Sequence, residues 1–264
     1  MLLSIITINY NNAEGLERTI KSVQEQTYPE IEHIIIDGGS QDGAVEIIKR
    51  YEEKIAYWVS EPDNGIYHAM NKGVTQAHGD YCLFLNSGDI LYDRDAVEKL
   101  CSQQINADIV AANLECEDAS GSSNIPPEEI TYSFFFISSI PHPSTLIRTE
   151  LLRNTHYRED YKIISDWIFF FDTLILQNVT YQHVDVFFSK FDMSGVSRNK
   201  EKALIEQERY LSSIIPPRVY CEYNQPIVKS YITSLQLPKP CLKVCRNVIR
   251  TCQWLVRHGL IKQK

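Results

Sequence analysis

The sequence lacks several of the signatures that assign a protein class directly. Its 264 residues contain no apolar run of about 18 residues, so no membrane-spanning helix is expected. No Gly-rich dinucleotide fingerprint follows the first expected strand and no P-loop motif occurs, which argues against a dinucleotide-binding domain and a P-loop NTPase. The seven cysteines include no Cys-x-x-Cys pair, so neither a zinc site nor a disulfide framework is predicted, and a reducing compartment such as the cytoplasm is expected. The first residues, MLLSIITINY, lack the parts of a signal peptide and are expected to form a strand.

The charge is unevenly distributed. The net charge is −8, but the residues from Lys239 onward hold seven Lys or Arg and no Asp or Glu, so the rest of the chain carries 19 basic and 34 acidic residues. An acidic body argues against nucleic acid as a partner. The basic tail, 239–264, has apolar residues at spacings of three and four, which predicts an amphipathic helix. Two interpretations stay open: a helix docked on the domain, or one on an anionic membrane surface.

The first part of the chain alternates between two kinds of segment. Short, almost wholly apolar segments are separated by segments with helical spacing of their apolar residues. This pattern predicts a doubly wound, mostly parallel α/β sheet covered by helices on both faces. Strands are expected over 2–8, 31–36, 55–59, 81–85 and 107–112, and helices over 13–26, 43–51, 64–77 and 93–102.

The later part of the chain changes character. Residues 115–129 read as an acidic loop or hairpin tip, and 132–140 as an aromatic-rich cover over the sheet. A strand is expected over 144–148, a helix over 166–176, a strand over 181–191 and a helix over 201–214. We predict one domain over 1–215, with halves of about 1–113 and 114–215, followed by a helical basic extension over 216–264.

The expected strands end in polar residues, and such sheets bind ligands at the carboxyl ends of their strands. Asp89 closes the stretch FLNSGD after the fourth strand. It could bind a divalent cation that bridges to a diphosphate, or cap the helix expected near Asp93; position alone favours the cap. Asp37 occupies the place of a ribose- or base-binding acid, or forms a turn before two glycines.

Two further stretches carry candidate site residues. In the run Asp63–Gly73, Asn64 is a possible cap or ligand, Asn71 needs partners if it is buried, and Lys72 could meet a phosphate. Asp166, in an apolar setting, could be a general base or only a helix cap, and the residues alone leave both open. His142, between two prolines, is more often structural.

Taken together, these segments resemble the family 2 glycosyltransferases of GT-A fold, the inverting enzymes of bacterial surface polysaccharide synthesis, and within them the branch of colanic-acid and O-antigen synthesis. The matching pieces occur in the family's order and cover roughly residues 2–197. They are SIITINYNN, QTYPEIEHIIIDGGSQDG, SEPDNGIYHAMNKGVTQAHGDYCLFLNSGD, PHPSTLIR, SDW and FDMSGVS.

The resemblance implies a role for each candidate residue. Asp166 would be the catalytic base and Asp89 the ligand of Mn²⁺ or Mg²⁺, while His142, Ser194 and Gly195 would border the acceptor or the diphosphate. The nucleotide sugar would be bound by Thr7, Tyr10, Asn11, Asp37, Gly38, Asp63, Asn64, Asn71, Lys72 and Ser87.

The resemblance also implies a reaction. A nucleoside-diphosphate sugar, a UDP-sugar by preference, would be the donor, and a saccharide or lipid-linked saccharide the acceptor, with the basic tail at the inner face of the membrane. One departure stands out: Gly88 replaces an acid that the family commonly has beside the residue matched by Asp89. This thinned acid cluster leaves a second reading, a catalytically weak protein that binds sugar nucleotides. A sugar nucleotidyltransferase is disfavoured because NYNNAEG follows the first strand in place of a Gly-rich loop.

Overall fold

The structure is a computed structural model that describes residues 1–117, 121–193 and 200–223. The chain divides into two compact units, Met1–Ala203 and Leu204–Lys264, which are described separately. The predicted boundary between residues 215 and 216 therefore lies inside the second unit.

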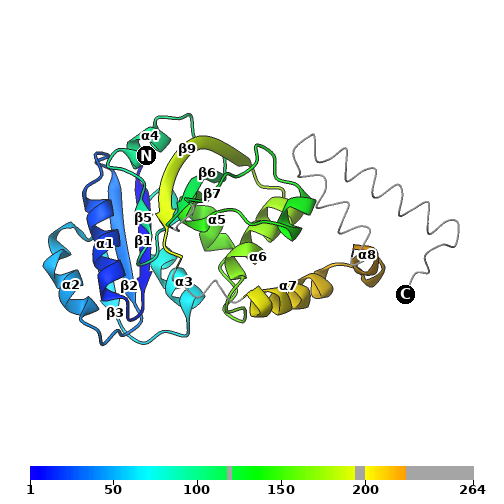
Figure 1. Cartoon of the computed structure of the whole chain (residues 1–264), viewed down its shortest axis with the longest axis horizontal. Helices are drawn as coiled ribbons and strands as arrows, with labels where there is room; N and C mark the ends of the chain where they lie inside the picture. The colour runs from blue at the N-terminus through cyan, green and yellow to red at the C-terminus, as the bar shows by residue number, and fades with distance from the viewer. Residues whose placement is uncertain (118–120, 194–199, 224–264) are drawn as a thin grey trace, which may run out of the picture. The chain divides into compact units, whose positions relative to one another are not determined.

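The first unit is built on one sheet with the strand order β3-β2-β1-β4-β8-β6-β9-β5 (Figure 1). Four of these strands are parallel neighbours: β1 (Leu3–Asn9), β2 (Ile31–Asp37), β3 (Tyr57–Ser60) and β4 (Tyr81–Phe84). Their register aligns Asn9 with Asp37 and Asp37 with Ser60, so the polar residues that end these strands lie side by side.

The second half of the sheet is mixed. An antiparallel strand, β8 (Thr145–Arg148), lies between β4 and β6 (Ile109–Cys116), and β9 (Tyr181–Phe191) runs parallel to β6. The short strands β5 (Ile90–Leu91) and β7 (Ser123–Asn124) pair antiparallel with β9 and β6. A sheet that is mostly parallel in its first half is confirmed, and the insertion of β8 from far along the chain is the feature that the local pattern did not predict.

Helices cover both faces of the first half of the sheet. Leu16 and Ile20 of α1 (Ala13–Gln24) and Ala44 of α2 (Ala44–Arg50) pack with Ile35 of β2 on one face. On the other face α3 (Ile66–Gln76) approaches closely through Gly73, where an added Cβ would lie 2.4 Å from Cγ2 of Ile6. The helix α4 (Ala96–Cys101) completes this half.

Shorter helices carry the second half: η2 (Tyr132–Phe136), η3 (His142–Ser144), α5 (Thr149–Asn154) and α6 (Ser165–Phe171), which continues as the π-helical turn η4 (Asp172–Leu176). The start of α3 differs from the predicted start at residue 64. α3 begins at Ile66, because Gly65 adopts a φ of +116° and the carboxylate of Asp63 accepts the N–H of Gly65 rather than capping the helix.

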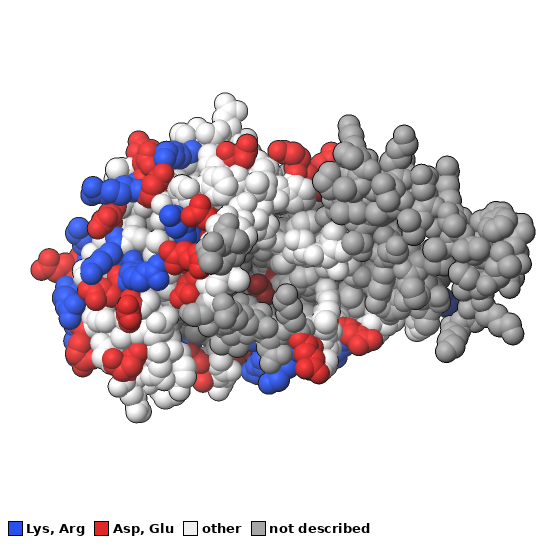
Figure 2. All heavy atoms as spheres, in the orientation of Figure 1, with Lys and Arg blue, Asp and Glu red and all other residues white. Residues whose placement is uncertain are grey.

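The described part of the second unit is helical. Helix α7 (Lys200–Ile214) crosses the division between the units, and α8 (Pro217–Tyr223) follows it. Within the described ranges no helix is both long and apolar enough to span a membrane. The predicted basic tail, 239–264, lies outside the described residues. Over the face of the first unit visible in Figure 2, acidic and basic side chains are interspersed.

Candidate active site

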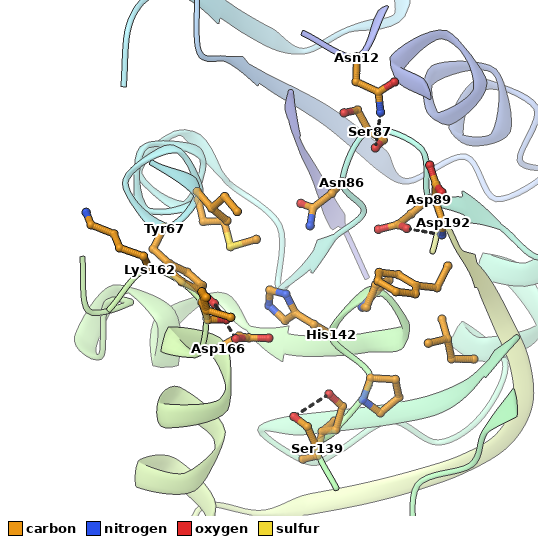
Figure 3. A pocket seen from close by; sticks show the side chains of 18 residues that line it. Asn12, Tyr67, Asn86, Ser87, Asp89, Ser139, His142, Lys162, Asp166 and Asp192 are labelled. Atoms are coloured by element: carbon orange, nitrogen blue, oxygen red, sulfur yellow. Dashed lines mark hydrogen bonds between the residues drawn. The ribbon is translucent and has the colours of Figure 1, made fainter. Parts of the chain in front are cut away.

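A pocket of about 390 Å³ opens beyond the carboxyl ends of β1 and β4 (Figure 3). Most of its wall comes from five stretches that are distant in sequence, and Asn12 and Leu114 complete it. The five are the turn Asn86–Asp89, the start of α3, the segment 139–143, the segment that leads into α6 and the end of β9 with Asp192. The fold therefore brings the FLNSGD turn and the SDW motif to one cavity.

Asp89 is almost wholly buried in this pocket, with 3% of its surface exposed. Its Oδ1 accepts the backbone N–H of Asp192 at 2.9 Å. Burial raises the pKa of Asp89 to about 8; the N–H of Asp192 opposes the rise and the carboxylate of Asp192 adds to it. Helix α4 starts at Ala96 after Asp95, so the alternative of a capping role for Asp89 is not realised.

Gly88 is required where it stands. Its φ is +107°, and an added Cβ would lie 2.5 Å from Oδ2 of Asp192. The residue that departs from the family's acidic pattern is therefore the one that gives Asp192 room beside the turn. A second carboxylate reaches the pocket from the end of β9 rather than from within the turn.

The oxygen atoms near Asp89 fit a divalent cation. Within the described part of the chain no three His, Cys, Asp or Glu gather closely enough to hold a metal ion. However, Oδ1 of Asn86 is buried without a hydrogen-bond partner among the described residues, and it lines the same pocket as the carboxylates of Asp89 and Asp192. Mg²⁺ and Mn²⁺ take few protein oxygens and complete their shells with water and phosphate, which suits this set.

Asp166 lies on the opposite side of the pocket, near the start of α6 (Figure 3). Tyr67 of α3 donates its hydroxyl to Oδ1 of Asp166 at 2.7 Å. The N-cap position of α6 is Ile164 and no side chain caps this helix, so Asp166 is not a cap. The carboxylate therefore lines the cavity and is held by a side chain from the other half of the domain.

His142 is buried and lines the pocket through its place in an aromatic cluster. Its Nε2 lies 2.8 Å from the hydroxyl of Tyr157, and its ring stacks on Phe84 with centroids 4.9 Å apart. Burial lowers the pKa of His142, with the charge of Asp166 opposing, so the ring is neutral at neutral pH. His142 thus combines the structural role with a position at the site.

Asp37 joins the ends of three strands. It is fully buried and accepts hydrogen bonds from the hydroxyls of Ser40 and Ser60, both at 2.6 Å, and from the amide of Asn9 at 2.7 Å. Burial alone would raise the pKa of Asp37, but these hydrogen bonds outweigh it and hold the pKa below its ordinary value. Asp37 is therefore an ionised, rigid anchor at the strand ends.

A second group of predicted residues surrounds this anchor. A Cβ added to Gly38 would lie 2.7 Å from Oδ2 of Asp63 and 3.1 Å from the ring of Tyr10, so the three residues meet at one place. Tyr10 is 68% exposed, which leaves its side chain available for stacking. Asn11 shapes the adjoining loop, since its N–H donates to the hydroxyl of Ser40 and its Oδ1 accepts from Gln41.

Two more predicted residues lie near the pocket. Ser87 lines it, and its carbonyl accepts the side-chain amide of Asn12 at 3.1 Å. The carbonyl of Asn64 accepts the ammonium of Lys162, itself a lining residue, at 3.2 Å. The predicted residues Ser194 and Gly195 lie outside the described residues.

Three further predicted ligands do not line the pocket and have structural partners instead. Thr7 is fully buried, and its hydroxyl donates to the carbonyl of Leu85 at 2.8 Å. Asn71 is a structural clamp: its side chain donates to the carbonyl of Tyr157 and accepts that residue's N–H. Lys72 forms an ion pair with Glu61. Met70, which precedes Asn71, lines the pocket.

Sequence reasoning missed four lining residues as ligands: Asn12, Tyr67, Lys162 and Asp192. Tyr67 and Asp192 reach their partners across 99 and 103 residues of chain, so no local spacing relates them. The available signal was proximity to motifs already singled out, since Tyr67 lies in the run Asp63–Gly73 and Asp192 lies in the motif FDMSGVS.

Comparisons with known proteins agree with this architecture. The model of glycosyl transferase family 2 matches residues 4–174. An uncharacterized glycosyltransferase of Mycobacterium tuberculosis is 33% identical over 211 residues, which cover 77% of this chain and 79% of the relative. The putative teichuronic acid biosynthesis glycosyltransferase TuaG of Bacillus subtilis is 39% identical over 101 residues, covering 37% of this chain and 40% of TuaG.

Solved structures support the fold. S. aureus TarS in complex with UDP-GlcNAc superposes with a TM-score of 0.65 at 18% identity, over 89% of this chain and 71% of that one. The mannosyltransferase PcManGT of Pyrobaculum calidifontis, in complex with GDP-Man and Mn²⁺, gives a TM-score of 0.59 at 16% identity, over 95% and 80% of the two chains. The predicted GT-A fold is confirmed.

Proposed function

Since the chain belongs to glycosyl transferase family 2 and is a glycosyltransferase, we propose that it is an inverting enzyme that transfers a sugar from a nucleoside-diphosphate sugar to a saccharide or lipid-linked acceptor. The observation that carries this proposal is the division of carboxylates in the pocket. Asp89 and Asp192 lie together at one side, and Asp166 faces the cavity from α6 at the other. This arrangement suits one group that removes a proton and another that binds the leaving diphosphate.

The mechanism follows from the residues. The hydroxyl of the acceptor attacks the anomeric carbon, the bond from that carbon to the diphosphate oxygen breaks, and Asp166 takes the hydroxyl proton as general base. A single displacement inverts the anomeric centre, so an α-linked donor of a D-sugar gives a β-linked product. His142 lines the pocket, is hydrogen-bonded to the hydroxyl of Tyr157, and has a pKa that burial lowers.

A divalent cation would be held by Asp89, Asp192 and Asn86. When bound, such an ion neutralises charge on the leaving diphosphate as a Lewis acid. Two observations support its use: the buried, unpartnered oxygen of Asn86 and the raised pKa of Asp89, whose ionised form needs positive charge nearby. PcManGT, with Mn²⁺ in its complex, is consistent with this assignment.

The nucleoside would lie along the strand ends. The exposed ring of Tyr10 offers a stacking face, while Asp63, Gly38 and the anchored Asp37 form the adjoining edge. We propose a UDP-sugar donor, which the TarS complex with UDP-GlcNAc supports by analogy of fold. The similarity to TuaG supports a bacterial surface polysaccharide as the product.

We further propose that the tail, 239–264, meets the inner face of the membrane. Flotation with anionic liposomes should be lost when the tail is deleted, and unchanged flotation would contradict this proposal.

Calorimetry and turnover test the assignment of roles. UDP binding in the presence of Mn²⁺ should be lost in Asp89→Ala, whereas Asp166→Asn should bind UDP normally and lose transfer. Asp172→Asn, a change in the turn that follows α6 and outside the pocket, is the matched control and should retain both. A panel of nucleotide sugars assayed for metal-dependent hydrolysis identifies the donor. Transfer that survives in Asp166→Asn would overturn the base assignment, and normal binding with no turnover by any donor would favour a sugar-nucleotide binding protein.

A further inference from the structure

Resting on the proposed role of Asp166 as general base, we propose that Tyr67 is its positioning residue, which holds one oxygen of the Asp166 carboxylate so that the other meets the acceptor hydroxyl. Tyr67 stands on the first turn of α3, in the donor half of the domain, and Asp166 stands near the start of α6, in the acceptor half. The contact between them therefore joins the two halves at the reacting centre.

The geometry supports this role directly. The Tyr67 hydroxyl lies 2.7 Å from Oδ1 of Asp166 and 2.7 Å from the carbonyl oxygen of Ile163. A phenolic hydroxyl has one proton, so it donates to one of these acceptors at a time. In Figure 3 the carboxylate of Asp166 meets Tyr67 at one end and projects into the pocket, where an acceptor would approach it.

The second acceptor, the carbonyl of Ile163, allows the Tyr67 hydroxyl to change its hydrogen-bond partner. An ionised carboxylate is the stronger acceptor, so the Tyr67 proton bonds to Asp166 while Asp166 is ready to act as base. Once Asp166 has taken a proton, the hydroxyl can turn to the carbonyl of Ile163 without moving its ring. A hydrogen bond donated to a carboxylate stabilises its negative charge, and Phe at position 67 would remove that bond.

Tyr67 is built to remain in this place. Its side chain is buried, and its ring packs against Tyr157 with centroids 5.7 Å apart. Further along the same helix, Gly73 fixes α3 against Ile6 of the sheet. Burial raises the pKa of Tyr67 well above its ordinary value, and the charge of Asp166 raises it further, so the hydroxyl stays a neutral donor.

Among the described residues, the charge of this carboxylate also acts on His142 in η3 and on Tyr157 after α5. Lys162, just before α6, lines the same pocket. Burial lowers the pKa of His142 and raises the pKa of Tyr157, which favours the neutral form of both side chains. The ammonium of Lys162 donates to the carbonyl of Asn64.

The test is the pH dependence of transfer by Tyr67→Phe, with Tyr81→Phe as the matched control. Tyr81 is also buried and its hydroxyl also makes two hydrogen bonds, but it lies outside the pocket, bonded to the carbonyl of Ala107 and to Arg148. Tyr67→Phe should lower kcat about ten-fold or more, leave the KM for the donor within about two-fold, and move the acid limb of the kcat/KM profile about one pH unit higher. Tyr81→Phe should change neither kcat nor the limb.

Each outcome has a distinct meaning. A normal kcat and an unmoved acid limb in Tyr67→Phe would overturn the positioning role, even if its melting temperature falls. Transfer that survives in Asp166→Asn would instead show that the proposed base is wrong. If Tyr67→Phe does not fold, 3-fluorotyrosine incorporated at position 67 replaces it. This stronger donor of nearly equal size should move the acid limb to lower pH, and no movement would refute the inference.

Discussion

A single methyl group at position 88 should damage the site in two separable ways. Alanine at a φ of +107° costs about 1–2 kcal/mol of backbone strain. Its Cβ would also lie 2.5 Å from Oδ2 and 3.1 Å from Cβ of Asp192, so Asp192 must move. Because the N–H of Asp192 holds Asp89 at 2.9 Å, the displacement reaches both carboxylates. We expect Gly88→Ala to lose about 2–4 kcal/mol of unfolding free energy in total.

Gly43→Ala separates the two effects. Gly43 has a φ of +95°, similar to that of Gly88, but an added Cβ there meets open space. It should therefore lose only the backbone term, about 1–2 kcal/mol in urea unfolding. Titration of UDP in the presence of Mn²⁺ should show about ten-fold weaker binding for Gly88→Ala, which corresponds to about 1.4 kcal/mol, and unchanged binding for Gly43→Ala.

Measurements on Gly88→Ala and Gly43→Ala can show that Asp192 has no part in the cation site. If Gly88→Ala binds UDP and Mn²⁺ as tightly as the wild type and loses no more stability than Gly43→Ala, then Asp192 is not part of the cation site. The thinned acid cluster would then have no compensating group, and the interpretation of Gly88 as the residue that admits Asp192 would be wrong.

Two further predictions concern residues outside the pocket. Burial lowers the pKa of His33 to about 3, below its value in the unfolded chain, so the unfolded state takes up the proton first as the pH falls below about 6.5. His33→Gln should therefore lose about 2 kcal/mol less stability than the wild type between pH 7 and pH 5, measured by urea unfolding; equal losses would contradict this. Asn71→Ala should lose about 1–3 kcal/mol because the backbone of Tyr157 loses two partners, while UDP affinity stays unchanged in calorimetry. A loss of UDP affinity would restore the predicted ligand role of Asn71.

The first half of the fold could be predicted because its information is local. Ile34, Ile35 and Ile36 are buried on alternating faces of β2, and such continuous apolar runs between amphipathic helices imply a doubly wound sheet. The place of β8 could not be predicted in this way. Its pairing with β4 joins Cys82 to Ile147, and nothing in either segment specifies the other.

The site residues also differ in whether local sequence or long-range contacts place them. Asp37, Asp89 and Asp166 lie at or near strand and helix ends that can be recognised in the sequence. They could therefore be singled out as candidate site residues. Thr7 also lies near a strand end, but its side chain points into the core, which depends on strand phase rather than proximity to the end. Asp192 enters the site only because β9 runs beside β6 and ends near the turn after β4.

The stereochemistry of donor hydrolysis tests the central claim most directly, because water replaces the unknown acceptor. Proton NMR during the first minutes of hydrolysis of an α-linked nucleotide D-sugar, identified from the donor panel, reports which anomer forms before mutarotation. We expect that the β-sugar appears first and that Asp166→Asn produces none above the uncatalysed rate. Initial formation of the α-sugar would contradict a single displacement with Asp166 as base.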